Sequence, residues 1–215
     1  MNILSYPLRY LKLRNEAGRK LYRRDTGFVV IMATLLALPF ILLDGNFFGA
    51  GGMLDRVGSF SSVLTGFYIA ALVGVASLST AVGDLDEVIT RGPIFGPDAD
   101  SGELEELTRR QYVCSLFGYL AFISLFVSIS SIFAVVSSGL IDDTSVQMAQ
   151  NAISKLSGYN INVAYYTGFF RCTLIAVYTL IISHVVATTC HGLYYYIDKI
   201  YMKSNVIVGK SDEDS

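Results

Sequence analysis

Four long apolar stretches, separated by polar connections, set the pattern of this 215-residue chain. They cover residues 26–43, 60–82, 112–138 and 165–190, and none contains more than one charged residue. About 20 helical residues cross the roughly 30 Å hydrocarbon core of a bilayer. The pattern therefore predicts an all-α fold, an integral membrane four-helix bundle that lies in the lipid bilayer.

The first stretch is the shortest, with 18 uncharged residues and Pro39 near its end. A secretory signal peptide is the competing interpretation, but its apolar region has about 7–15 residues and ends at a small-residue cleavage site. Here the chain continues as DGNFFGAGG. We therefore expect an uncleaved first span in which a kink at Pro39 is tolerated.

Composition agrees with a membrane protein. The mean hydropathy is +0.50, and 16% of the residues are charged, against about 25% in ordinary soluble domains. The three cysteines lie in or beside apolar stretches and do not form the pattern of a disulfide framework.

Charge predicts the orientation of the four spans. The N-terminal arm, the polar segment 83–110 and the C-terminal tail would share one side and carry 13 Lys and Arg residues, whereas the two other connections carry two. Because positive loops stay in the cytoplasm, both termini are predicted to be cytoplasmic.

The arm, residues 1–25, carries seven basic residues, and its leucines recur at roughly helical spacing. This favours a basic amphipathic helix that lies in the membrane interface. An arm that only obeys the positive-inside rule would account for the charges equally well. At the other end, residues 200–215 are expected to form a flexible tail.

The segment 83–110 is acidic, with eight carboxylates from Asp84 to Glu106 and one basic residue among them. Asp100 and Glu103 fit a capping box. Glu105 and Glu106 precede Arg109 and Arg110 by four residues, the spacing of ion pairs on a helix. A helix is therefore predicted to begin near Ser101 and to continue into the third span. The segment is a candidate docking surface for a cytoplasmic protein with a basic face; a solvated connection is the alternative. The candidate docking residues are Asp100, Glu103, Glu105 and Glu106.

Small residues recur every four positions in the second span: Ser62, Gly66, Ala70 and Gly74. Such a stripe lets another helix approach closely, either within the subunit or from a second copy.

Polar groups inside the spans are candidate functional residues because they are expensive to bury there. They are Arg171 and His184 in the last span and the serine face Ser124, Ser128 and Ser131 in the third. The hydroxyls suit either helix packing or a water-filled path. Arg171 fits an interfacial anchor better than a gating charge, and His184 would be a hydrogen-bonded or a proton-responsive group.

Neither a cofactor nor a catalytic site is indicated. His191 follows His184 at a spacing of seven without a third donor, which disfavours a zinc site. Nucleophile-loop, metalloprotease and nucleotide-binding patterns do not occur, and neither does a DNA-binding motif. The sequence therefore predicts a protein that is not an enzyme and does not bind nucleic acid directly.

The arm NILSYPLRYLKLRNEAGRK, leading into four spans with an acidic middle segment, resembles the KwaA family, the membrane subunits of the Kiwa bacterial anti-phage defence systems. The resemblance implies an oligomer in the bacterial inner membrane that senses phage attack at the envelope and works with a cytoplasmic DNA-binding partner, a KwaB-like protein. A sensor or scaffold is the first functional hypothesis. A small oligomeric channel or membrane-disrupting effector is the alternative.

Overall fold

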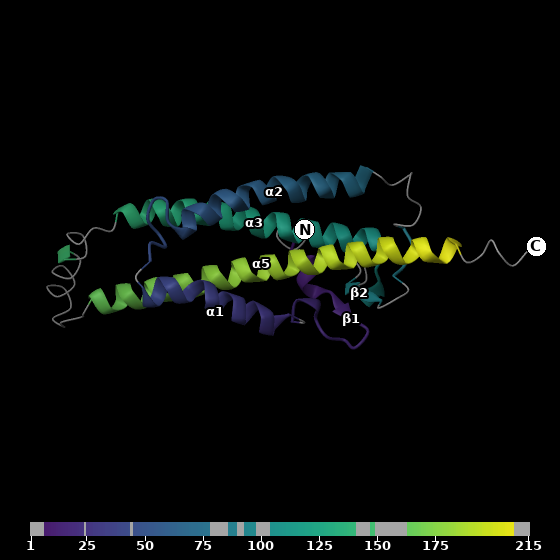
Figure 1. Ribbon diagram of the computed structural model, residues 1–215, viewed down its shortest axis with the longest axis horizontal. Coiled ribbons are helices and arrows are strands. Elements are labelled where there is room, and N and C mark those ends of the chain that lie inside the picture. The colour runs from purple at the N-terminus through teal and green to yellow at the C-terminus, as the bar shows by residue number, and fades with distance from the viewer. Residues whose placement is uncertain are drawn as a thin grey trace, which may run out of the picture. The chain divides into compact units, whose positions relative to one another are not determined.

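The computed structural model describes residues 7–23, 25–43, 45–77, 86–89, 93–97, 104–140, 147–148 and 163–208, with side chains left out at residues 140, 163–165 and 196–208. Over these residues the chain is mostly helical (Figure 1). The main helices are α1 (Thr26–Leu42), α2 (Met53–Ser77), α3 (Arg109–Leu140) and α5 (Val163–Val208).

Three of these helices are long and apolar enough to cross a membrane, over Met53–Ser77, Arg109–Gly139 and Tyr166–Tyr195. The prediction of a mostly helical membrane protein is thus confirmed. Helix α1 is apolar but has 17 residues. At 1.5 Å per residue it is about 25 Å long, somewhat short of the roughly 30 Å core.

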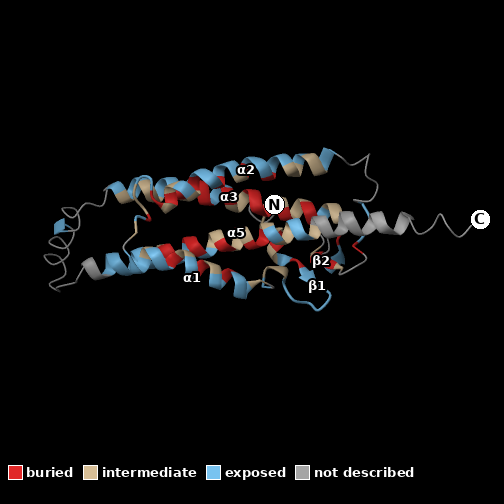
Figure 2. Cartoon of the chain, viewed as in Figure 1, coloured by how far each residue is buried: buried red, intermediate tan, exposed pale blue. Residues whose placement is uncertain are grey.

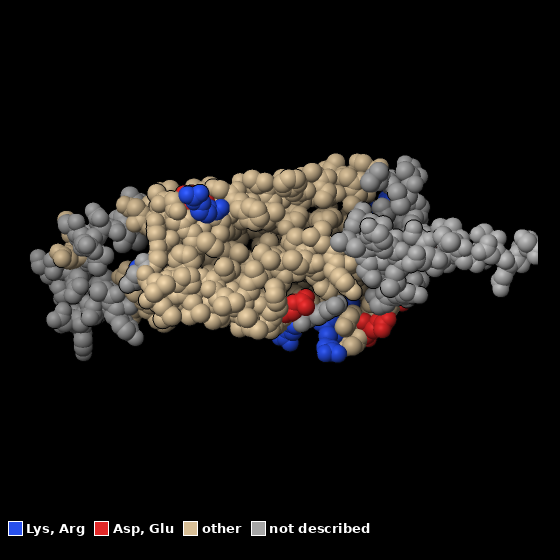
Figure 3. Space-filling view, in the orientation of Figure 1, with Lys and Arg blue, Asp and Glu red and all other residues tan. Residues whose placement is uncertain are grey.

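Large apolar side chains are exposed along all four helices, among them Phe28 and Leu35 on α1, Phe67 on α2 and Phe133 on α3 (Figure 2). Figure 3 shows that the helices carry few charged residues on the face drawn there. Exposed apolar helix faces of this extent are typical of contact with lipid rather than with water.

The chain divides into two compact units, each formed from separate segments. Unit 1 takes residues 1–25, 72–120 and 184–215, and unit 2 takes residues 26–71 and 121–183.

Unit 2 is built around the side chain of Phe47, which is 1% exposed. Its ring packs edge to face against Phe40 and Phe48, with centroids 5.1 and 4.9 Å away, and Leu54 and Ile175 belong to the same buried cluster. The connection between α1 and α2 is therefore part of the core of this unit.

Helix α2 begins at Met53, seven residues before the predicted span. The Asp55 carboxylate accepts a hydrogen bond from the Gly51 N–H at 2.9 Å, and Gly51 has a φ of 70°. A backbone turn at Gly51, whose N–H is bound by the Asp55 carboxylate, starts the helix early. Residues 78–82 of the predicted second span lie outside the described residues.

Unit 1 contains a three-stranded antiparallel sheet that the sequence did not predict. Its order is β1 (Arg14–Asn15), β2 (Ile94–Pro97), β3 (Leu104–Glu106), with Arg14 opposite Phe95 and Phe95 opposite Glu106. Leu13, Ile94 and Leu107 are buried against it. A Cβ on Gly96 would lie 2.6 Å from the Leu107 side chain and 3.0 Å from that of Leu13, so a larger residue there would require the Leu107 side chain to move.

The basic amphipathic helix predicted for the arm is wrong. Residues 7–23 form the 3-10 helix η2 (Pro7–Lys12), strand β1 and the 3-10 helix η3 (Leu21–Arg23). A tight turn with Gly18 at a φ of 69° separates β1 from Lys20, which pairs with Arg14. The Leu13 side chain is buried against the sheet. Pairing with distant strands overrides the local helical spacing.

The helix predicted from near Ser101 is also wrong, because residues 104–106 are strand β3 and α3 begins at Arg109. At the other end, α5 continues to Val208, into the tail that was predicted to be flexible. Neither Gly nor Pro occurs between Leu193 and Val208, so nothing local ends the helix before Gly209.

Candidate functional site

The N-terminal arm and the acidic segment form one folded body in unit 1, which we call the sheet module: residues 7–23, 86–89, 93–97 and 104–111. Besides the strand pairing, the Arg9 Nη2 donates a hydrogen bond to the Pro97 carbonyl at 2.8 Å. The two segments were predicted as separate surfaces, one basic and one acidic. The structure joins them.

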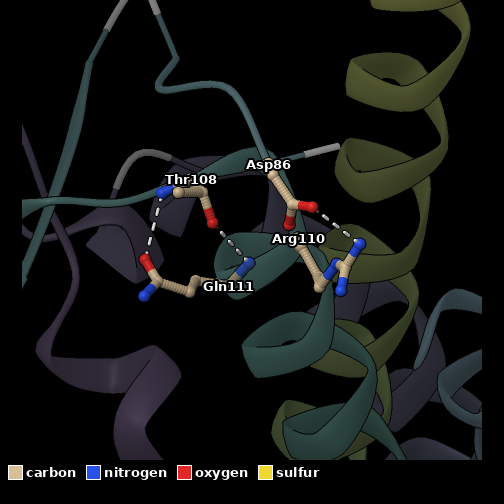
Figure 4. Close-up of polar contacts among 4 residues, drawn as sticks. All are labelled: Asp86, Thr108, Arg110 and Gln111. Atoms are coloured by element: carbon tan, nitrogen blue, oxygen red, sulfur yellow. Dashed lines mark hydrogen bonds and ion pairs between the residues drawn. The ribbon is translucent and has the colours of Figure 1, made fainter. Parts of the chain in front are cut away.

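A reciprocal cap fixes the start of α3 within this module. The Thr108 N–H donates to Gln111 Oε1 at 3.0 Å, and the Gln111 N–H donates to Thr108 Oγ1 at 3.3 Å (Figure 4). This is a capping box, in which two helix-end donors are satisfied by side chains. A threonine followed three residues later by a glutamine is a sequence signal for the start of a helix. The sequence contains a second capping pair, Asp100 and Glu103, and the helix predicted to begin there is wrong.

Arginine residues of α3 pair with carboxylates that lie about 24 residues earlier. The Arg110 guanidinium lies 3.1 Å from Asp86 Oδ2 (Figure 4), and Arg109 lies 3.9 Å from Glu87 Oε2. Both carboxylate side chains are about 60% exposed, so each pair contributes little free energy. Backbone contacts also join residues 86–89 to the start of α3, because Val88 pairs with Thr108 and the Arg109 N–H donates a hydrogen bond to the Glu87 carbonyl at 3.1 Å.

The predicted docking residues divide into two groups. Glu105 and Glu106 lie on β3, whose three residues are all exposed, whereas Asp100 and Glu103 lie outside the described residues. The predicted helical pairs of Glu105 with Arg109 and of Glu106 with Arg110 are wrong, because the two glutamates belong to a strand.

An aromatic series links the arm to His184 in unit 1. The Tyr10 ring stacks on Tyr119 of α3 with centroids 5.1 Å apart, and Tyr119 meets the edge of His184 on α5 at 6.0 Å. Tyr10 and Tyr119 are buried, and His184 is half-buried. Tyr119 is thus a ring neighbour of His184.

The small-residue stripe does not form the close helix contact of this chain. Ser62, Gly66 and Ala70 are exposed, and a Cβ built on Gly66 or Gly74 would meet no described atom within 4 Å. The close approach occurs at Gly58 in unit 2, where a Cβ would lie 2.8 Å from Ser131 Cβ of α3. Sequence reasoning missed Gly58, which lies one turn before the stripe.

The serine face is buried in the structure: Ser124 is 1% exposed, Ser128 8% and Ser131 2%. The Oγ atoms of Ser124 and Ser131 have no hydrogen-bond partner among the described residues, and the same holds for Ser183 on α5. Ser183 is a further buried polar group that sequence reasoning did not single out.

Arg171 is exposed, and its Nη2 lies 3.5 Å from the Gly45 carbonyl, a weak contact by distance. Among the described residues, no group of three or more His, Cys, Asp and Glu side chains is placed to hold a metal ion.

Fold and site together define a helical membrane protein that carries a small folded module beside one of its long apolar helices. The chain matches no family model, no curated protein and no solved structure.

Proposed function

We propose that this chain is a non-enzymatic, multi-pass protein of a bacterial inner membrane, which senses phage attack at the envelope and recruits or activates a cytoplasmic partner through the sheet module. The observation that carries the proposal is the module itself. Two segments some 80 residues apart in sequence pair as strands and bury Leu13, Ile94 and Leu107 between them. A mere connection between helices needs no such core.

The pairing of β1 with β2 also supports four spans. Between these strands the chain passes through α1 and α2, and α2 is long enough to cross the membrane. If α2 crosses, α1 must cross as well for β2 to return to the side of β1. The exposed apolar face of α1 suits that role, and local thinning of the bilayer can accommodate a helix about 25 Å long.

The excess of basic residues in the arm, the polar segment and the tail favours a cytoplasmic position for the module and both termini. There the exposed carboxylates of Glu105 and Glu106 are available to a partner with a basic face. The resemblance to the KwaA family suggests a KwaB-like protein as that partner. Contact with nucleic acid would then be made by the partner.

The stripe on α2 supports assembly of several copies. Gly66 and Ala70 are exposed in the chain, and small residues on a membrane helix suit the close approach of another helix. We therefore propose a homo-oligomer in which Gly66 and Ala70 contact a second copy.

A capture experiment tests the docking surface. Association of a KwaB-family protein with the full chain in detergent is measured at low and at physiological salt. The variants Glu105→Gln and Glu106→Gln are compared with the control Glu16→Gln. Glu16 is an exposed glutamate in the turn after β1, at the opposite edge of the sheet. We expect slower association for the two β3 variants at low salt, and convergence with the parent as salt screens the charge. Unchanged association of both variants at both salt concentrations would show that the partner docks elsewhere.

A channel is the second candidate function, favoured by the buried hydroxyls of Ser124 and Ser131, for which the described part of the chain supplies no hydrogen-bond partner. Ion flux in vesicles containing the purified chain distinguishes it from the scaffold. Flux that Ser124→Ala and Ser131→Ala change would support the channel, because both replacements remove only the hydroxyl oxygen.

A further inference from the structure

A groove between α2 and α3 in unit 2 carries polar groups that the proposed function does not use. It has a volume of about 370 Å³, within the range of small-molecule sites. We call it the α2–α3 groove. Its polar lining is Asp55, Ser59, Ser62, Ser128 and Ser131.

The polar groups on the α2 side of the groove are acceptors. Ser59 donates its hydroxyl proton to the Asp55 carbonyl at 3.0 Å, and Ser62 donates to the Ser59 carbonyl at 2.8 Å. Their oxygen lone pairs remain available, and so does most of the accepting capacity of the Asp55 carboxylate, which receives one bond from Gly51. Neither lysine nor arginine lines the groove. A cationic hydrogen-bond donor fits this arrangement.

The α3 side supplies an independent observation. Ser131 is 2% exposed, lines the groove, and its Oγ has no hydrogen-bond partner among the described residues. A buried hydroxyl without a partner is unfavourable, and a ligand in the groove would satisfy it. Ser124 is equally buried and equally without a partner, but it does not line the groove.

The groove is apolar along its other rim, formed by Ile132, Val135 and Val136 of α3. Asp55 lies in the first turn of α2, whose 25 residues extend about 37 Å and exceed the roughly 30 Å core. Asp55 is thus at headgroup level, and Ser62 lies about 10 Å deeper. Ile132 and Val136 are exposed where a hydrocarbon chain would run.

We propose that the α2–α3 groove binds an ethanolamine phospholipid, with its primary ammonium group on Asp55 and the serine oxygens and an acyl chain along Ile132 and Val136. A choline headgroup has no N–H to donate to these acceptors and is disfavoured. The inference requires that α2 lies in a membrane, and it is independent of any cytoplasmic partner.

Lipid titration of the full chain tests the proposal. The purified chain in detergent is titrated with short-chain phosphatidylethanolamine, phosphatidylcholine or phosphatidylglycerol, and bound lipid is counted by native mass spectrometry. We expect the ethanolamine lipid to bind about tenfold more tightly than the choline lipid, the range of one charge-assisted hydrogen bond.

Variants identify the residues responsible. Asp55→Asn keeps an oxygen for the Gly51 N–H but removes the charge, and it should abolish the preference for ethanolamine. Ser131→Ala should reduce the preference for the ethanolamine lipid over the choline lipid by about threefold. Ser124→Ala, matched in burial and in its lack of a partner, should leave it unchanged. Far-UV circular dichroism checks that all three variants fold.

Several results would overturn the proposal: equal binding of ethanolamine and choline lipids, a preference that survives Asp55→Asn, or equal effects of Ser131→Ala and Ser124→Ala. Displacement of the lipid by potassium alone would assign the site to a free cation. Disulfide cross-linking of Ser62→Cys between copies, insensitive to lipid, would show that a second copy fills the groove.

Discussion

Replacing Gly58 by alanine adds one methyl group at a close contact between α2 and α3. The new Cβ would lie 2.8 Å from Ser131 Cβ, an atom next to the backbone that moves only with its helix. Overpacking of this kind costs about 1–3 kcal/mol. Alanine also favours the helix over glycine by about 0.5–1 kcal/mol, which offsets part of that cost.

Gly66→Ala is the matched control. It adds the same methyl group to the same helix, but with no described atom within 4 Å. The gain in helix propensity is common to both variants, so it cancels in their comparison. Gly58→Ala should therefore be less stable than Gly66→Ala by the overpacking cost alone, about 1–3 kcal/mol.

The assay is unfolding of the purified chain in mixed micelles with increasing dodecyl sulfate, followed by far-UV circular dichroism. Gly66→Ala should unfold at the same or a higher denaturant fraction than the parent, and Gly58→Ala at a lower one. Equal midpoints for the two variants would refute the assignment of Gly58 to the helix contact. A lower midpoint for Gly66→Ala than for Gly58→Ala would return that contact to the predicted stripe.

Three further outcomes are expected. Phe47→Ala should destabilise the chain by about 3–5 kcal/mol in the same assay, because it empties the centre of the unit 2 core; Phe28→Ala, which removes an exposed ring from α1, should cost much less. Gly66→Leu should reduce oligomer size in detergent, measured by light scattering, while an unchanged size would show that the stripe faces lipid. Reporters placed after Ser215 and after Ala99 should be cytoplasmic and one after Ser154 periplasmic, and a periplasmic signal at Ala99 would contradict four spans.

Helix content and membrane character could be predicted because they depend on long runs of local composition. The sheet could not, since its strands have two to four residues and β1 pairs with a strand some 80 residues away. No periodicity is measurable over so few positions, and in the arm the leucine spacing favoured a helix instead.

The stripe did not identify which face of α2 packs within the chain, for a different reason. Two rows of small residues run along α2 from Gly58: Ser62, Gly66 and Ala70 at successive steps of four, and Ser61 and Thr65 at steps of three and four, which is the buried row. Both permit close packing, and spacing alone does not choose between them. The buried face follows from which residues lie opposite on α3, such as Ser131, and that information is not local to α2.

The pairing of β1 with β2 has a consequence for biosynthesis. Arg14 leaves the ribosome some 80 residues before Phe95, its partner in the sheet. At about 5–20 residues per second, the arm waits roughly 4–16 seconds for that partner to be made. During this interval Leu13 has none of its sheet contacts and its apolar side chain is available to chaperones or to the bilayer surface. The sheet can therefore form only after α1 and α2 have both been synthesised.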